Sequence, residues 1–148
     1  MPEMSNTLSS QSREELVFEG VHCKLRLSLP APRVCIATFT GPDVGEFGDA
    51  PVRALSEYLE QHGTMTLFVD GRKVPGASVE VSGTWAYWMQ ENRGRLEEIH
   101  LLCGSRFIHL TANFVRRFAE LEEKMFLYTE AKAFDLAVGT AMARHNGG

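Results

Sequence analysis

The run Thr66-Leu67-Phe68-Val69-Asp70-Gly71 and the segment 82–89, Ser-Gly-Thr-Trp-Ala-Tyr-Trp-Met, decide the fold that we expect for this chain. The first run is apolar or β-favouring up to a single Asp followed by Gly, which is typical of a buried central strand in an α/β sheet. The segment 82–89 places Trp85, Trp88 and Met89 at the i, i+3, i+4 spacing of one helix face. We therefore expect a strand, a loop and a helix that packs on the sheet. Ligands and partners of open α/β sheets meet the carboxyl ends of the strands, so Asp70 and the following loop form the expected working edge.

Upstream of this stretch, the sequence predicts an antiparallel entry into the sheet. A strand-like pattern begins at Glu14, and residues 23–29 alternate apolar and polar side chains, which indicates a strand with one solvated face. Pro30 and Pro32 interrupt that strand, and residues 33–40 follow at once as a strand that is apolar on both faces. So short a link predicts a hairpin, because tightly joined neighbouring strands are antiparallel.

Downstream, the chain is expected to alternate helices with strands. Asp49 is a good N-cap for one helix, and Ser82 is expected to cap the helix that carries both tryptophans. In a later helix, Phe114, Val115 and Phe118 are expected to face the sheet. The expected helices cover about 50–61, 82–92, 110–122 and 130–143, and the expected strands 66–69, 98–103 and 124–128.

The expected element order is β-β-α-β-α-β-α-β-α, with short connections and right-handed crossovers. We therefore predict one α/β domain over residues 14–144, with a mixed, mostly parallel sheet and an antiparallel N-terminal hairpin. Residues 1–13 contain almost nothing to bury and are expected to be a disordered leader. Residues 145–148 are expected to be a frayed tail.

The composition argues against several functional classes. The chain has 148 residues, which is enough for one domain with an ordinary core. Its net charge of −4 argues against a nucleic-acid-binding protein, because such proteins normally carry a basic patch or stripe. No apolar run approaches the roughly 18 residues that span a bilayer, and the N-terminus has no secretion signal, so we expect a cytoplasmic protein. The three cysteines show no CxxC or Cys–His spacing and are interpreted as small buried hydrophobes, although a disulfide between Cys23 and Cys35 stays open.

The candidate site residues gather around the stretch that decides the fold. Asp70 could position a partner, or it could receive the backbone N–H groups of its own turn. Tyr87 points away from the tryptophan face and is a candidate partner contact. The candidate contact residues for a partner or ligand are Asp70, Arg72, Lys73, Ser82, Thr84 and Tyr87, and the candidates for an apolar pocket are Trp85, Trp88 and Met89.

No cofactor, metal or catalytic site is expected from the sequence. No pair of histidines has metal-binding spacing, and no Ser, His and Asp arrangement has the context of a catalytic nucleophile. A small hydrolase or transferase that uses Asp70 with His100 or Ser105 is the minor enzymatic hypothesis.

The element order, the acid that ends the run 67–70 and the closing run 127–134 (Leu-Tyr-Thr-Glu-Ala-Lys-Ala-Phe) resemble the STAS family. The similarity to these anti-sigma-factor-antagonist-like domains, and especially to their SpoIIAA-like relatives, covers roughly residues 15–142. The resemblance implies a non-enzymatic regulatory or scaffold module of a bacterial-type system that contacts a protein partner. An apolar small-molecule or lipid carrier, with a pocket between the Trp-bearing helix and the sheet, is the alternative. A homodimer also stays open.

One position departs from the family pattern. STAS antagonists carry a phosphorylatable Ser directly after the strand-ending Asp, whereas this chain has Gly71 there. The family's phosphorylation switch is therefore not expected at this position. If the chain is phosphorylated nearby, Ser82 and Thr84 are the best candidates.

Overall fold

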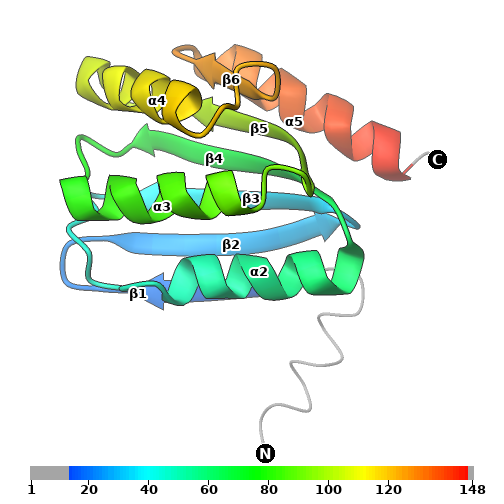
Figure 1. The fold of residues 1–148 in the computed structure, drawn as a ribbon, viewed down its shortest axis with the longest axis horizontal. Helices are drawn as coiled ribbons and strands as arrows, with labels where there is room; N and C mark the ends of the chain where they lie inside the picture. The colour runs from blue at the N-terminus through cyan, green and yellow to red at the C-terminus, as the bar shows by residue number, and fades with distance from the viewer. Residues whose placement is uncertain (1–13, 147–148) are drawn as a thin grey trace, which may run out of the picture.

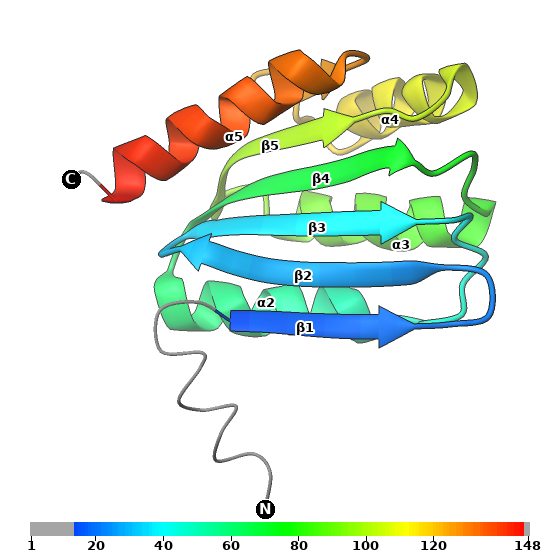
Figure 2. The same cartoon turned by 180° about the vertical axis from the view of Figure 1, so that it is seen from behind.

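In the computed structural model, which describes residues 14–146, the chain forms a six-stranded sheet flanked by four helices. The strands are β1 (Glu14–Glu19), β2 (Lys24–Ala31), β3 (Val34–Thr40), β4 (Met65–Lys73), β5 (Leu96–Leu102) and β6 (Met125–Tyr128). The helices are α2 (Ala50–His62), α3 (Val79–Glu91), α4 (Arg106–Phe118) and α5 (Ala131–Asn146). Helices α2, α3 and α4 cover one face of the sheet (Figure 1), and α5 lies on the other face (Figure 2).

The expected fold class is confirmed. The strands lie in chain order across the sheet, with β1, β2 and β3 antiparallel and β3 to β6 parallel. The sheet has one strand more than the expected order, because residues 14–19 form a separate strand that pairs with β2. The chain reverses before β2 because the Gly20 N–H donates to the Cys23 carbonyl at 2.8 Å and the Glu46 carboxylate accepts the Val21, His22 and Cys23 N–H groups.

Burial of the strands follows the sequence pattern. Leu25, Leu27 and Leu29 of β2 point into the core beneath α2, α3 and α4, as their strict alternation predicts. The central strand β4 is buried on both faces, with Leu67 in that core and Phe68 in a second core beneath α5. Burial on both faces explains why this run is continuously apolar.

Two helices begin earlier than expected. Helix α3 starts at Val79 because the Ser78 hydroxyl accepts the Val81 N–H at 3.1 Å, so the prediction that Ser82 is the N-cap is wrong. Helix α4 starts at Arg106, where Ser105 caps it in the same way by accepting the Ile108 N–H at 3.2 Å.

The inward face of α4 also differs from the expectation. Val115 is buried as predicted, together with Ala112, but the neighbouring Phe114 and Phe118 are exposed. The inward face consists of Ile108, Ala112, Val115 and Ala119, and at about 100° per residue Phe114 and Phe118 fall outside it. Small side chains therefore pack α4 against the sheet, and its large aromatic side chains point to solvent.

The ends of the expected domain are only partly covered by the described residues. The expected leader, residues 1–13, lies outside them, and α5 continues to Asn146, beyond the expected boundary at residue 144. No helix between residues 14 and 146 is long and apolar enough to cross a bilayer. Cys23, Cys35 and Cys103 are all free and buried, so the disulfide that the sequence left open is not formed.

Candidate functional site

The expected working edge at Asp70 is occupied by internal contacts. Strand β4 does not end at Asp70 but continues past a bulge to Lys73, which pairs with Thr40. Asp70 accepts the Arg72 backbone N–H at 3.1 Å and the Arg72 Nε–H at 3.0 Å. The Arg72 guanidinium also donates to Asp135 of α5 at 2.7 Å. Hydrogen bonds to Asp70 and Asp135 raise the pKa of Arg72, and together they tie the end of β4 to α5.

The structure separates the candidate contact residues into two groups. Asp70 and Arg72 face α5, and Lys73 is exposed at the strand end. Ser82, Thr84 and Tyr87 lie on α3, which covers the opposite face of the sheet (Figures 1 and 2). The six residues therefore do not form one site.

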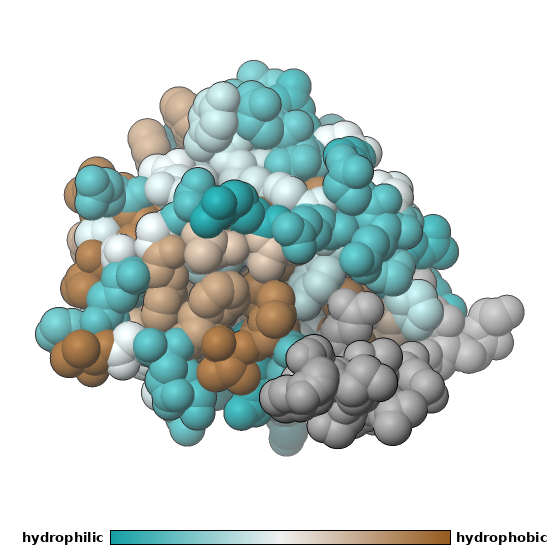
Figure 3. Space-filling model, turned by 90° about the horizontal axis from the view of Figure 1, so that it is seen from below, coloured by the Kyte–Doolittle hydropathy of each residue, from teal (hydrophilic) through white to brown (hydrophobic). Residues whose placement is uncertain are grey.

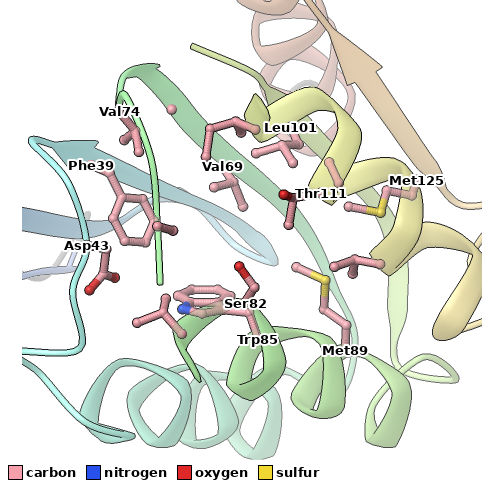
Figure 4. A pocket seen from close by; sticks show the side chains of 16 residues that line it. Phe39, Asp43, Val69, Val74, Ser82, Trp85, Met89, Leu101, Thr111 and Met125 are labelled. Carbon is pink, nitrogen blue, oxygen red and sulfur yellow. The ribbon is translucent and has the colours of Figure 1, made fainter. Parts of the chain in front are cut away.

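A cavity of about 120 Å³ lies between α3, α4 and the neighbouring strands β4 and β5 (Figure 4). Its walls are almost entirely apolar and include Trp85 and Met89, two of the three candidate pocket residues. Trp88 does not line this cavity. Its ring is 6% exposed and packs toward α2, where Nε1–H donates to the Ser56 hydroxyl at 2.9 Å.

Two hydroxyl groups face the cavity without a partner. The side chains of Ser82 on α3 and Thr111 on α4 both point into the space near Trp85 and Leu101 (Figure 4). Within the described residues, neither hydroxyl makes a hydrogen bond. Neither hydroxyl oxygen is fully buried, so water or a ligand can reach both.

Asp43 is the charged residue at the rim of the cavity. Its side chain is buried, and its carboxylate accepts the Gly45 N–H at 3.0 Å. Burial raises the pKa of this carboxyl group. None of the described residues that line the cavity is Lys, Arg or His, so the site offers hydroxyl and carboxyl groups but no positive charge.

Outside the cavity, α4 presents a row of large apolar side chains to solvent. Phe107, Leu110, Phe114 and Phe118 are 58, 61, 68 and 53% exposed. The rings of Phe114 and Phe118 stack with centroids 6.0 Å apart. We refer to this row as the α4 stripe. The four residues follow one another at intervals of three, four and four in the sequence, which is the spacing of one helix face. The prediction from the sequence did not identify this face because it assigned Phe114 and Phe118 to the inward side.

The α4 stripe borders a groove whose other wall is α3. Val79, Gly83 and Tyr87 of α3 line this groove, and Ser82 and Thr111 line both the groove and the cavity. The two hydroxyls therefore stand where the cavity opens to the surface. Val79, Gly83, Tyr87 and the α4 stripe together are called the α3–α4 face below.

A second apolar area lies at the β1 edge of the sheet. Figure 3, which views the molecule from the side of β1 and α2, shows apolar side chains gathered there. Leu16 and Val17 of β1 are exposed, and the ion pairs Glu15–Arg26 at 3.0 Å and Glu19–Lys24 at 3.8 Å flank them. Charged residues along an edge strand oppose pairing with another sheet, so we assign no binding role to this edge.

The residues of the enzymatic hypothesis are engaged in structural contacts. His100 lies beneath α5, with Nδ1 at 2.8 Å from the Tyr128 hydroxyl and Nε2 at 2.8 Å from Glu98 Oε1. Ser105 caps α4. The part of the chain that the structure describes contains no group of three or more side chains that could hold a metal ion.

Comparison with known proteins gives the fold a name. No family model and no curated protein matches the sequence. An uncharacterised DUF3478-family protein with a SpoIIAA-like fold, from Shewanella loihica, is similar with a TM-score of 0.55 and 7% identity. The match covers 86% of this chain and 94% of that protein. This chain has a SpoIIAA-like fold. An anti-sigma factor antagonist from Mycobacterium paratuberculosis is similar with a TM-score of 0.45 and 13% identity, over 88% and 97% of the two chains.

In this SpoIIAA-like fold, the position after Asp70 has no room for a side chain. Gly71 is buried, and a Cβ atom there would lie 2.9 Å from the Leu102 carbonyl oxygen. The loop after β5 packs even more tightly, because a Cβ atom on Gly104 would collide with the Gly71 carbonyl oxygen and lie 2.7 Å from the Val74 carbonyl oxygen. Close backbone packing at this edge therefore excludes a serine in the present conformation.

Proposed function

We propose that this SpoIIAA-like domain is a non-enzymatic regulatory or scaffold module of the cytoplasm that works by binding another protein through its α3–α4 face. The observation that supports this proposal best is the α4 stripe. A contiguous exposed apolar surface is unusual on a monomer and commonly marks an interaction site. Phe114, Phe118 and Tyr87 are aromatic residues, a type that is enriched at protein interfaces.

This contact does not need the STAS phosphorylation switch. Gly71 offers no hydroxyl, and the nearby Ser82 hydroxyl is half-buried at the mouth of the cavity. The Thr84 hydroxyl donates to the Glu80 carbonyl within α3 at 3.0 Å. We therefore propose that the α3–α4 face binds its partner without modification of this segment.

A photo-crosslinking amino acid placed at position 114 in the native cells tests the proposal. The matched control places it at Leu136, which is exposed on α5 on the other side of the sheet. We expect crosslinks to a different protein from position 114 and none from position 136. Crosslinks to such a protein from position 136 alone would contradict the proposal.

The cavity favours a second candidate function, the carriage of a small apolar molecule. Its volume of about 120 Å³ is close to the ~150 Å³ of a dry protein cavity that binds benzene. Ser82 and Thr111 would hydrogen-bond a polar group on the ligand at the mouth. Because Asp43 is acidic and no basic side chain lines the walls, that polar group should be neutral rather than a carboxylate or phosphate.

Fluorescence of Trp85 measures this second function directly. The substitution Trp88→Phe leaves Trp85, in the cavity wall, as the single tryptophan of the chain. We expect benzyl alcohol to change its emission at lower concentration than benzoate does, and Thr111→Val to weaken benzyl alcohol binding by about three- to tenfold. Equal responses to benzyl alcohol and benzoate, or no response to either, would rule out a pocket selective for neutral ligands.

A further inference from the structure

We infer that the α3–α4 face binds an amphipathic helix of the partner protein, with basic residues along the flank that meets α3 and acidic residues along the flank that meets α4. This inference rests on the proposed function and deepens it, because it states the chemistry of the segment that the face binds. The shape of the groove between α3 and α4, its lack of free backbone groups and the charges along its two rims carry the inference.

The groove runs between two helices that lie side by side and point the same way (Figure 1). At one end, the Ser105 hydroxyl before α4 donates at 3.3 Å to the Pro75 carbonyl in the loop before α3. At the other end, Arg93 after α3 pairs with Glu120 after α4 at 3.6 Å. The groove is lined on α4 by side chains from residues 107–118, so its length is about 17 Å, which is three turns of a helix.

The walls of the groove offer side chains but almost no free backbone groups. Most of its lining residues lie inside α3 and α4, where backbone N–H and C=O groups bond within the helix. The lining side chains are apolar apart from the hydroxyls of Ser82, Thr111 and Tyr87. An extended segment docked here would bury backbone groups without partners, whereas a helix satisfies its own. The groove therefore favours a helix over a strand.

The relief of the groove suits the side chains of a helix. One wall is the α4 stripe, whereas the α3 wall contains the small residues Ser82, Gly83 and Ala86. No atom lies within 4 Å of the position that a Cβ would take on Gly83, so a large apolar side chain has room there. Apolar residues at i, i+3 or i+4, and i+7 of the docked helix would occupy this space.

The rim of the groove on α3 is acidic. Glu80 and Glu91 are the charged side chains of this helix, and both are exposed. Together with Tyr87 they line the neighbouring groove beside α2, so they lie on the side of α3 away from α4. Neither makes an ion pair within residues 14–146. Basic side chains that reach over Tyr87 from the docked helix would pair with them.

The rim on α4 is basic. Arg106 and Arg117 are exposed and likewise make no ion pair within the described part of the chain. At about 100° per residue, they lie roughly 20–40° around α4 from Leu110, on the side away from Phe114. Arg116 does not contribute to this rim, because it donates to a carbonyl of β6. Acidic side chains on the second flank of the docked helix would pair with Arg106 and Arg117.

The two rims together discriminate between occupants. Charged residues on either side of an apolar seam determine which helices pair in coiled coils. An anionic membrane would be attracted by Arg106 and Arg117 but repelled by Glu80 and Glu91. A helix with one basic and one acidic flank satisfies both rims, so charge complementarity favours it over a lipid surface.

Phage-displayed random peptides test the inference without the native partner. Peptides of about 16 residues span the groove as a helix. The full wild-type chain serves as bait, and the selected pool is depleted on Phe114→Asp. We expect the enriched sequences to carry apolar residues at helical spacing, with basic residues on one flank and acidic residues on the other. No enrichment, or enriched sequences without this pattern, would overturn the inference.

Fluorescence anisotropy of the most enriched peptide, made synthetically, measures its affinity for protein variants. Phe114→Asp should weaken binding at least about tenfold, and the control Leu136→Asp, on exposed α5 surface, should leave it unchanged. A proline in the centre of the peptide should also weaken binding at least about tenfold, because it breaks a helix. Circular dichroism of each protein variant confirms that it is folded. A proline-containing peptide that binds as well as the original would overturn the inference.

A charge reversal then tests the acidic rim. Glu91→Lys should weaken binding of the peptide by about three- to tenfold, because it places like charges together. The basic residues of the peptide are replaced by Glu one at a time. One of these peptides should bind Glu91→Lys within about threefold of the original affinity. A reversal without effect, or one that no replacement restores, would overturn the arrangement of the flanks.

These outcomes are distinct from those of the proposed function. A native partner that crosslinks to position 114 through an extended segment would leave the proposed function standing and remove the helix. Helical peptides that bind the isolated chain, with cellular crosslinks from position 136 and none from position 114, would leave the groove as a helix-binding site and remove the proposed function.

Discussion

Trp88 donates its indole N–H to the Ser56 hydroxyl at 2.9 Å, and this bond joins α3 to α2. The contact gives the two tryptophans different roles. Trp88 is buried between two helices, whereas Trp85 is partly buried, packs edge-on against Phe39 at 5.8 Å and lines the cavity.

The two tryptophans should therefore differ in their contribution to stability. We expect Trp88→Ala to lower the free energy of unfolding by about 3–5 kcal/mol, because it removes a large buried ring and leaves the Ser56 hydroxyl unpaired. Trp85→Ala should cost less, because its ring already borders empty space. Urea unfolding of both variants provides the measurement. Equal losses would show that the cavity wall at Trp85 is as tightly packed as the α2–α3 contact.

Gly71 should not tolerate the serine that STAS antagonists carry at this position. The added Cβ would meet the Leu102 carbonyl oxygen at 2.9 Å, so we expect Gly71→Ser to cost about 1–3 kcal/mol of stability. Gly76→Ser is the matched control, because no atom lies within 4 Å of its Cβ position. A Gly71→Ser protein as stable as the control would mean that the backbone near Leu102 shifts to admit the side chain at little cost in free energy.

Replacing Thr111 by Val should leave the stability of the ligand-free protein unchanged or raise it. The Thr111 hydroxyl makes no hydrogen bond to the described residues and is not fully buried, so the substitution removes no internal hydrogen bond and adds a methyl group beside apolar walls. Thr84→Val is the comparison, because its hydroxyl donates to the Glu80 carbonyl at 3.0 Å. Differential scanning calorimetry should show no drop in Tm for Thr111→Val. A drop of several degrees would mean that the hydroxyl is satisfied in solution.

Stability should depend on pH through His100. Burial lowers the pKa of His100 below its ordinary value of 6.5, although the Glu98 carboxylate opposes part of this shift. Below pH 6.5 the unfolded chain therefore binds this proton more readily than the folded chain, and stability falls with the pH. Above pH 6.5 both states hold the neutral ring, and the contribution is fully present.

The difference between wild type and His100→Asn isolates this contribution. The charged and titratable groups that influence the ring are Glu98, Tyr128 and Arg144, and the substitution keeps all three. Urea midpoints measured between pH 5 and pH 8 should show a steeper loss on acidification for wild type than for the variant. Parallel curves would assign the acid sensitivity to other groups.

Much of the fold was predictable because local patterns determine which residues share a face. The alternation of Leu25, Leu27 and Leu29 identified β2, and the continuous apolar run to Val69 identified a central strand. The spacing of Trp85, Trp88 and Met89 likewise identified one face of α3. Periods of about two and 3.6 residues survive in almost any tertiary context, so these inferences required no neighbours.

Much less of the candidate site could be predicted. The sequence pointed to Trp85 and Met89, which line the cavity, and to Tyr87, which lies on the α3–α4 face. It gave no sign that Thr111 on α4 would come to lie near Ser82 on α3, because these residues are brought together only by the packing of two helices on one sheet.

The sequence by itself determined the strand–helix alternation, the central buried strand and the absence of a hydroxyl after Asp70. Only the tertiary structure decided which face of α4 is buried and what each polar group binds. Phe114 is exposed and Val115 is buried, because α4 packs on the sheet through small side chains. Asp70 accepts a hydrogen bond from the Arg72 guanidinium, and the same guanidinium donates to Asp135 on α5. The contact with α5, which the sequence does not show, therefore holds Arg72 beside Asp70. Periodicity groups residues into faces, but the shape and charge of neighbouring elements decide where each face points.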